Sequence, residues 1–233
     1  MPPKIRVAIL DDHLSIVDGY LYRLKDLRNI EVVGTAAFGA ELEPLLAEHP
    51  VDVLILDVNV PTTPDNPNPY PILHVIPTLL QKYPDMTVLV ISMLAEHLLI
   101  RAVMEAGASG YILKDDSESI RELGAIMQSV ASGGVYLSQQ AQQQLFKRHL
   151  KPGEPALTRR QIEVLSLCAA HPDASIADLA SKLGVTNSTI RNLLSGAYLR
   201  LGVHTRAAAL ATARQRELIT PEVSLARLKS PPP

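Results

Sequence analysis

This chain of 233 residues has a single cysteine and no long apolar run. Its one cysteine, Cys168, excludes an internal disulfide framework, and no Cys/His spacing typical of a zinc site occurs. No run approaches the ~20 apolar residues that span a bilayer. Asp11-Asp12 interrupts the apolar start of the chain too early for a signal peptide. We therefore expect a cytoplasmic protein with no membrane partner, in which Cys168 is a buried core thiol.

Charge is divided unevenly along the chain. Residues 1–150 carry 11 Lys and Arg against 18 Asp and Glu, whereas residues 151–233 carry 11 against 6. The overall formal charge of −2 hides this asymmetry, which indicates that only the second half meets a polyanion. The length suits one large domain or two modest ones, and 47% hydrophobic residues are enough for proper cores.

Strand and helix patterns alternate along the first half of the chain. Near-continuous runs of Val, Ile and Leu are typical of strands buried on both faces, as in a parallel sheet. We expect strands at 4–10, 31–35, 53–57, 87–91 and 110–113, and helices at 13–27, 41–49, 73–83, 96–106 and 117–131. Strands that alternate with crossover helices predict an α/β domain over residues 1–131, built as a flavodoxin-like, doubly wound five-stranded parallel sheet.

Two segments depart from this alternation. Residues 61–71 contain five prolines just past Asp57, so we expect an extended loop at that edge of the sheet, neither helix nor inner strand. Whether this loop is a tolerated insertion or binds a partner stays open. Residues 132–155 are expected to be a linker, with a Gln-rich helix over 138–150 and a Pro/Gly-containing end.

The last third of the chain shows helical patterns only. We expect helices at 159–170, 176–183, 187 to about 201, and 205–216. Two short helices joined by a turn at Gly184, the second capped by Thr186, match the helix-turn-helix arrangement, whose second helix enters the major groove of DNA. We therefore predict an all-α DNA-binding domain over 156–216 and a flexible tail over 217–233. A helical bundle with a solvated basic face is the plainer alternative.

Polar side chains follow four of the expected strands directly. Asp11 and Asp12 come after the first strand and Asp57 after the third. Ser92 and Lys114 follow the last two. The carboxyl ends of parallel strands meet at one edge of a sheet, and ligands bind there. The sequence therefore predicts that all five side chains converge.

These residue types suit phosphate and Mg²⁺ chemistry. Carboxylates supply the hard oxygen ligands that Mg²⁺ takes together with waters and phosphate oxygens. Asp57 can then attack a phosphoryl group and hold it as an acyl phosphate, while Lys114 and Ser92 contact the phosphoryl oxygens. Strand-end acids often do no more than cap loops and helices. That reading suits Asp11 or Asp12 alone better than it suits all five residues together.

Five features together resemble the bacterial two-component response regulators of the NarL/FixJ subfamily. They are DDH at 11–13, DV at 57–58, Ser92, EAGASGYILKD at 105–115 and the block 158–203. The resemblance covers roughly residues 4–215 and implies a receiver domain coupled to a LuxR-type helix-turn-helix. It also implies a phosphorylation-switched transcriptional regulator that is not an enzyme. The implied partners are a sensor histidine kinase and double-stranded DNA, and the phosphorylated form is expected to be a homodimer.

The resemblance also assigns roles at the acidic edge. Asp57 is the implied phosphoacceptor. Asp12, Asp57 and the main-chain carbonyl of Asn59 are the implied Mg²⁺ ligands, and Asp11 assists, largely through water. By the same resemblance, Lys114 contacts the phosphoryl group.

Further roles concern the switch and the DNA. Ser92 is the implied switch hydroxyl, and Tyr111 is the aromatic that reorients with it. On the recognition helix, we expect an exposed Arg191 to contact a guanine edge and Arg200 to contact phosphate. The full set expected to bind DNA is Thr186, Asn187, Ser188, Thr189, Arg191, Asn192 and Arg200.

Two other functions share some of these sequence features. Haloacid-dehalogenase-like phosphatases also form an aspartyl phosphate on a doubly wound sheet, but they need a second acid two residues after the nucleophile. Asn59 stands at that position and cannot serve, so an enzyme is disfavoured. The remaining alternative is a receiver-linked protein-interaction module with weak or no sequence-specific DNA binding, because Leu193 departs from the usual recognition-helix pattern.

Overall fold

The apolar runs of the first half form one parallel sheet in the computed structural model, which describes residues 4–146 and 157–219. The strand order is β2-β1-β3-β6-β7-β8. Every residue of β3, β6 and β7 is buried, which explains why these runs show no polar alternation: helices cover both faces of the sheet. The strand bounds are β1 Ile5–Leu10, β2 Ile30–Ala36, β3 Val53–Leu56, β6 Thr87–Ser92, β7 Gly110–Leu113 and β8 Tyr136–Leu137.

Two apolar clusters hold the helices onto the sheet. Because neighbouring strand residues point to opposite faces, Val53 and Ile55 belong to one cluster and Leu54 and Leu56 to the other. The first cluster contains buried residues of α1 (Leu14–Leu24) and α6 (Leu123–Ala131). The second contains those of α2 (Gly39–Glu48), α3 (Ile72–Lys82) and α4 (His97–Glu105), and it continues into the C-terminal helices. The doubly wound α/β prediction is confirmed.

The sheet has six strands where five were predicted. The added strand, β8, pairs in parallel with β7 and lies beyond residue 131, the expected end of the domain. Gly110 permits this pairing, since a Cβ there would lie 2.7 Å from the main-chain oxygen of Tyr136. The helix predicted over 117–131 is divided at Glu122 into α5 (Ser117–Arg121) and α6. A strand of two residues has no periodicity that a sequence pattern can reveal.

The proline-rich segment, which was expected to be an extended loop and neither helix nor inner strand, forms a separate β-hairpin outside the main sheet. Its strands, β4 (Pro61–Thr63) and β5 (Asn66–Pro69), pair antiparallel. The Thr62 hydroxyl donates to the main-chain oxygen of Asn68 at 2.9 Å. Both strands are edges, where a proline without an N–H is tolerated, and neither belongs to the main sheet, as the prolines predicted.

The four helices of the last third lie where the sequence predicted them. Thr158 caps α8 by accepting a hydrogen bond from the N–H of Gln161 at 3.3 Å. Gly184 ends α9 with φ +62°, a backbone conformation that favours glycine. Cys168 is fully buried, as expected. The helix bounds are α8 Arg159–Ala170, α9 Ile176–Leu183, α10 Asn187–Leu201 and α11 Arg206–Gln215.

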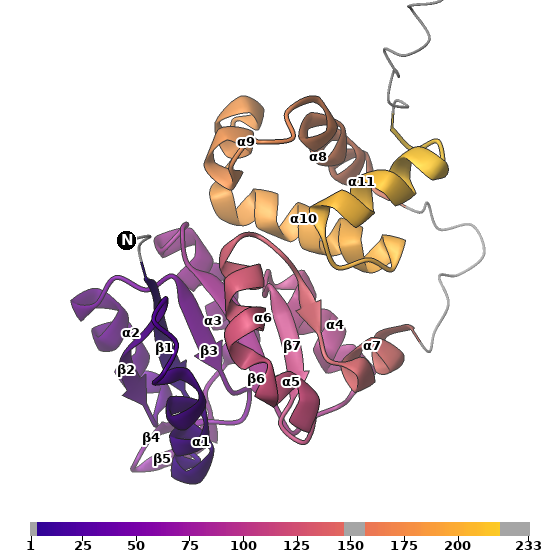
Figure 1. Ribbon diagram of the computed structural model, residues 1–233. Coiled ribbons are helices and arrows are strands. Elements are labelled where there is room, and N and C mark those ends of the chain that lie inside the picture. Colours follow the sequence, from indigo (N-terminus) through magenta and orange to yellow (C-terminus); the bar gives the residue numbers. More distant parts are fainter. Residues whose placement is uncertain (1–3, 147–156, 220–233) are drawn as a thin grey trace, which may run out of the picture.

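Figure 1 shows these four helices stacked on the α/β part, with α10 nearest to it, and α10 packs against α4. The linker helix α7 (Gln139–Phe146) covers the first part of the predicted 138–150, and the rest lies outside the described residues. Most of the tail expected over 217–233 lies outside them too. Within the described ranges, no helix combines the length and the apolar character that crossing a membrane requires.

Candidate functional site

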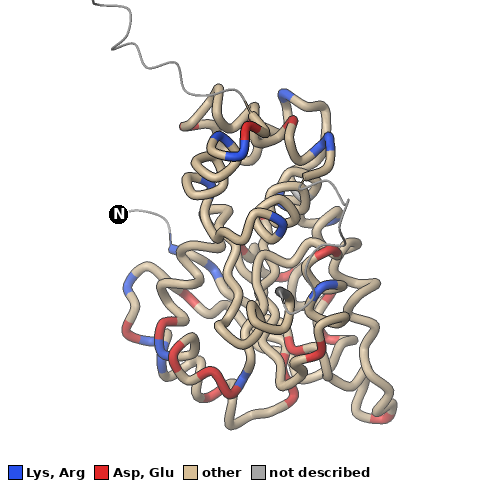
Figure 2. The backbone as a smooth tube through the Cα atoms, turned by 90° about the vertical axis from the view of Figure 1, so that its right-hand side faces the viewer, with Lys and Arg blue, Asp and Glu red and all other residues tan. Residues whose placement is uncertain are grey.

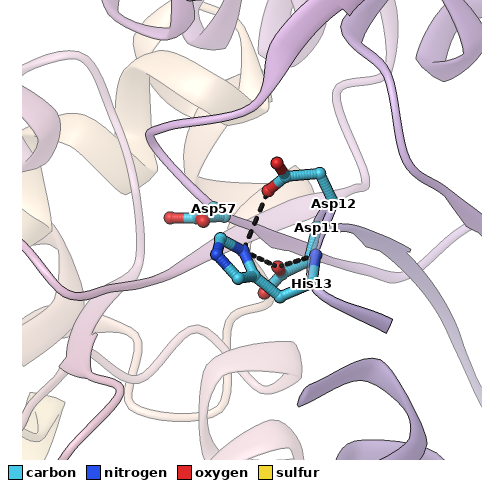
Figure 3. A group of neighbouring side chains, drawn as sticks. All are labelled: Asp11, Asp12, His13 and Asp57. Atoms are coloured by element: carbon cyan, nitrogen blue, oxygen red, sulfur yellow. Dashed lines mark hydrogen bonds and ion pairs between the residues drawn. The ribbon is translucent and has the colours of Figure 1, made fainter. Parts of the chain in front are cut away.

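Three carboxylates meet where β1 and β3 end (Figure 3). Asp11 is 1% exposed and Asp57 is 3% exposed, whereas the side chain of Asp12 is 31% exposed. One ligand atom from each of them, together with one from the His13 ring, lies within 4.8 Å of the others. The sequence therefore predicted the convergence of the acids correctly.

Lys114 completes the cluster from the end of β7. Its Nζ lies 2.7 Å from Asp57 Oδ2 and 2.8 Å from Asp11 Oδ2, and its side chain is 3% exposed. A buried ammonium between two buried carboxylates lowers the free-energy cost of burying these two negative charges close to each other. It also occupies only one oxygen of each carboxylate, so Asp11 Oδ1 and Asp57 Oδ1 are left to other partners.

The donor set fits a hard divalent cation. Asp12 Oδ1 is buried without a hydrogen bond from the described residues; its ion-pair contact is with the His13 ring. Asp57 Oδ1 has one long contact of 3.4 Å, from the N–H of Asn59. Converging carboxylate oxygens with unused lone pairs are what Mg²⁺ and similar ions bind. This cluster can hold a metal ion.

The main chain of Leu94 contacts both predicted switch residues, which are buried. The N–H of Leu94 donates to Ser92 Oγ at 3.3 Å, and the hydroxyl of Tyr111 donates to the main-chain oxygen of Leu94 at 2.6 Å. Burial raises the pKa of Tyr111 to about 12, so this phenol remains a donor near neutral pH. Leu94 lies in the loop that leads into α4, so these two hydrogen bonds connect both residues with the segment before that helix.

The recognition helix α10 lies with its predicted base-reading face against the α/β part. Arg191 is 9% exposed and donates to the main-chain oxygens of Pro84, Asp85 (3.1 Å) and Met86 (3.2 Å). Burial lowers the pKa of its guanidinium. Asn187 donates to Asp85 Oδ1 at 2.8 Å. The prediction that Arg191 is exposed was therefore wrong, because three main-chain carbonyls of the α3–β6 loop surround its guanidinium.

The other predicted DNA-binding residues have varied surroundings. Thr186 caps α10 by accepting from the N–H of Thr189 at 3.2 Å. Asn192 packs against Gly107, where a Cβ would lie 2.2 Å from the amide oxygen of Asn192. Arg200 is half-buried near the end of the helix, and the side chain of Ser188 lies outside the described residues. Figure 2 shows that the acidic residues gather mainly on the α/β part, below the C-terminal helices.

Comparison with known proteins identifies the family. A family model for the response regulator receiver domain matches residues 7–124. The probable transcriptional regulatory protein NarL of Mycobacterium tuberculosis is 30% identical over 222 residues, covering 94% of this chain and 97% of the relative. This chain belongs to the NarL/FixJ response regulators.

Other similar proteins are also transcriptional response regulators. The transcriptional regulatory protein MctR of Rhizobium johnstonii is 28% identical over 218 residues, covering 94% of this chain and 97% of the relative. The fold is similar to RcsB of Salmonella typhimurium, with a TM-score of 0.54 at 22% identity, over 89% of this chain and 97% of that one. RcsB in a complex with DNA matches with a TM-score of 0.55 at 22% identity, over 90% of this chain and 97% of that one.

Two features of the site were missed from the sequence. The DDH motif contains His13 but assigned its ring no role, although its position directly after Asp11-Asp12 was the signal that it would share their site. The loop 84–86 had no such signal, because it contacts Arg191 through main-chain carbonyls that every residue carries.

Proposed function

We propose that this response regulator accepts a phosphoryl group on Asp57 from a sensor histidine kinase, with Mg²⁺ as cofactor, and that phosphorylation controls DNA binding by its helix-turn-helix. The observation that carries the proposal is the position of Asp57, buried at the end of the central strand between Lys114 and two further acids. Because the regulated DNA lies in the cytoplasm of a bacterium, the protein acts there.

The chemistry follows from these contacts. An oxygen of Asp57 attacks the phosphorus of the donor's phosphohistidine, the P–N bond breaks, and the imidazole leaves with the electron pair. Lys114, already 2.7 Å from Asp57, balances charge on the transferred group. Asp12, Asp57 and the carbonyl of Asn59 would hold Mg²⁺, which supplies further neutralisation of the phosphoryl oxygens. Asn59 offers no acid or base at the position that a phosphatase needs, which supports a regulator and not an enzyme.

The main chain of Leu94 connects the phosphorylation site with the helices. A phosphoryl group on Asp57 attracts the Ser92 hydroxyl, which then gives up the N–H of Leu94. Tyr111, which donates to the carbonyl of the same residue, reorients into the vacated space. The loop before α4 is thereby rearranged, and α4 is the helix that packs against both α10 and α7. At its start, the His97 ring contacts the main-chain oxygen of Gln144 of α7 at 2.8 Å.

DNA and the α3–β6 loop compete for the same side chains. Arg191 and Asn187 cannot contact base edges while they contact Asp85 and its neighbours. Phosphorylation therefore acts by favouring an open state in which α10 is free, and it changes the populations of two existing states. The fold shared with RcsB, which has been solved in complex with DNA, supports this DNA-binding role.

In the closed state, Asn187 and Arg191 of α10 contact the α3–β6 loop. Removing the Asp85 side chain, which accepts from Asn187, should make this state less stable. We expect Asp85→Ala to raise the DNA affinity of the unphosphorylated protein about two- to five-fold, the value of one net hydrogen bond near a surface. The affinity of the phosphorylated protein should not change, because its open state already dominates. Fluorescence anisotropy with operator DNA measures both. Asp65→Ala, an exposed acid at the hairpin, is the matched control, and equal affinities for Asp85→Ala and wild type would contradict the closed state.

Phosphorylation should also change the assembly state. We expect phosphorylated protein to sediment as a dimer and unmodified protein as a monomer at the same concentration, since the change at α4 favours a state with a new surface. Analytical ultracentrifugation of wild type and Asp57→Asn, each treated with acetyl phosphate and Mg²⁺, makes the comparison. Identical distributions for treated and untreated wild type would count against the switch.

A further inference from the structure

His13 lies close enough to the acidic cluster to share a metal ion with it. Its Nδ1 is 2.9 Å from Asp12 Oδ1 and 3.2 Å from Asp11 Oδ1. Neighbouring ligands on an octahedral ion with bonds near 2.1 Å lie about 3.0 Å apart. Figure 3 shows the contacts of the ring with Asp11 and Asp12, and Asp57 belongs to the same group of neighbouring side chains. The imidazole nitrogen and the carboxylate oxygens are therefore already spaced as adjacent ligands of one ion.

We propose that His13 is a nitrogen ligand that selectively strengthens the binding of imidazole-preferring dications, such as Ni²⁺ and Zn²⁺, at the phosphorylation centre. Imidazole suits Zn²⁺, Cu²⁺ and Ni²⁺, whereas carboxylates and water suit Mg²⁺. Three carboxylates offer oxygen ligands to both classes of ion, and an added nitrogen strengthens the binding of Ni²⁺ and Zn²⁺ more than that of Mg²⁺. The inference rests on the metal site of the proposed function, and it adds a class of ion that competes there with Mg²⁺.

The described surroundings of His13 are compatible with this role. The side chain is 54% exposed, so the ring can adjust to the ion without disturbing packing. Its main-chain N–H donates to Asp11 Oδ1 at 3.0 Å, which fixes the turn that brings ring and carboxylates together. Nδ1, the ring nitrogen that contacts Asp11 Oδ1, is the atom that would bind the ion.

Lys114 does not block the site. It contacts the Oδ2 atoms of Asp11 and Asp57, whereas His13 approaches Asp11 through Oδ1. An ion beside His13 therefore uses carboxylate oxygens that the ammonium leaves open. It would compete with Mg²⁺ for the centre while Asp57 still pairs with Lys114.

The test compares Ni²⁺ and Mg²⁺ affinities of the full-length, metal-stripped protein by isothermal titration calorimetry. We expect His13→Ala and His13→Asn to weaken Ni²⁺ binding about ten-fold or more, as loss of groups around a metal does. Mg²⁺ affinity should change by less than about two-fold. His171→Ala, an exposed histidine at the end of α8, is the control for Ni²⁺ bound elsewhere and should leave both affinities unchanged. Asp12→Asn should weaken the binding of both ions.

The visible absorption spectrum of bound Co²⁺ gives a second readout, because it changes when a nitrogen ligand is replaced by oxygen. An unchanged Ni²⁺ affinity and Co²⁺ spectrum in His13→Ala would overturn the inference. Equal losses for Ni²⁺ and Mg²⁺ would overturn it too, because His13 would then only position the acids. Ni²⁺ binding that survives Asp12→Asn would place the ion elsewhere. All three results leave the proposed function intact, whereas wild-type protein that binds no Mg²⁺ would contradict that function itself.

Discussion

Asp57→Asn should abolish phosphorylation of this response regulator completely. Incubated with acetyl phosphate and Mg²⁺, wild-type protein should gain the mass of one phosphoryl group, and the variant should gain none. The amide is nearly the same size as the carboxylate but carries no charge and is a far weaker nucleophile, so the fold is kept while the acceptor is lost. Intact-protein mass spectrometry measures the result.

The neighbouring acids should not replace Asp57. Asp11 is buried between Lys114 and the His13 ring, and Asp12 belongs to the metal site, so neither is free to attack. Asp65→Asn, at the exposed hairpin, is the matched control and should be labelled like wild type. Asp12→Asn should remove the dependence on Mg²⁺ or the reaction itself, because the ion loses a direct ligand. Labelling that persists in Asp57→Asn would disprove the assignment.

Arg191→Ala should produce the second large loss, in the affinity of phosphorylated protein for its operator. Losing a bidentate contact to a base costs roughly 1–3 kcal/mol, or about 5- to 150-fold, and relaxes specificity at one base pair. Arg200→Ala should instead weaken all sequences alike and reduce the salt slope by about one unit. Fluorescence anisotropy over a set of operator variants and salt concentrations distinguishes the two effects.

The phosphorylation state matters for this comparison. Without phosphorylation, Arg191→Ala also removes the contacts of the guanidinium with the loop 84–86, so the gain from opening offsets part of the lost DNA contact. The full loss is expected only when the closed state is already depopulated. A uniform loss across operator variants would make Asn187 or Asn192 the next candidate for base reading. Binding that does not weaken as salt rises would favour a protein-interaction module.

Much of this architecture could be predicted because burial leaves a direct mark on sequence. Runs such as 53–57 are apolar throughout because both faces of β3 are covered, and strand ends of a parallel sheet meet at one edge. The rule about strand ends was sufficient to predict that Asp11, Asp57 and Lys114 lie close together. The C-terminal helices were equally readable, since a cap such as Thr158 and a left-handed glycine such as Gly184 mark helix ends locally.

The features that were not predicted are those that produce no recognisable pattern in the nearby sequence. The two residues of β8 are too few for periodicity, and the β4–β5 hairpin pairs in spite of its prolines because both strands are edges. The sequence by itself determined the two folds, the acidic edge and the recognition helix, because each depends on nearby residues or a general rule of sheets. Only the tertiary structure decided that Arg191 is buried on main-chain carbonyls of the other half of the chain, and that His13 Nδ1 lies 2.9 Å from Asp12. Both are contacts whose geometry depends on packing and side-chain orientation, which no residue pattern encodes.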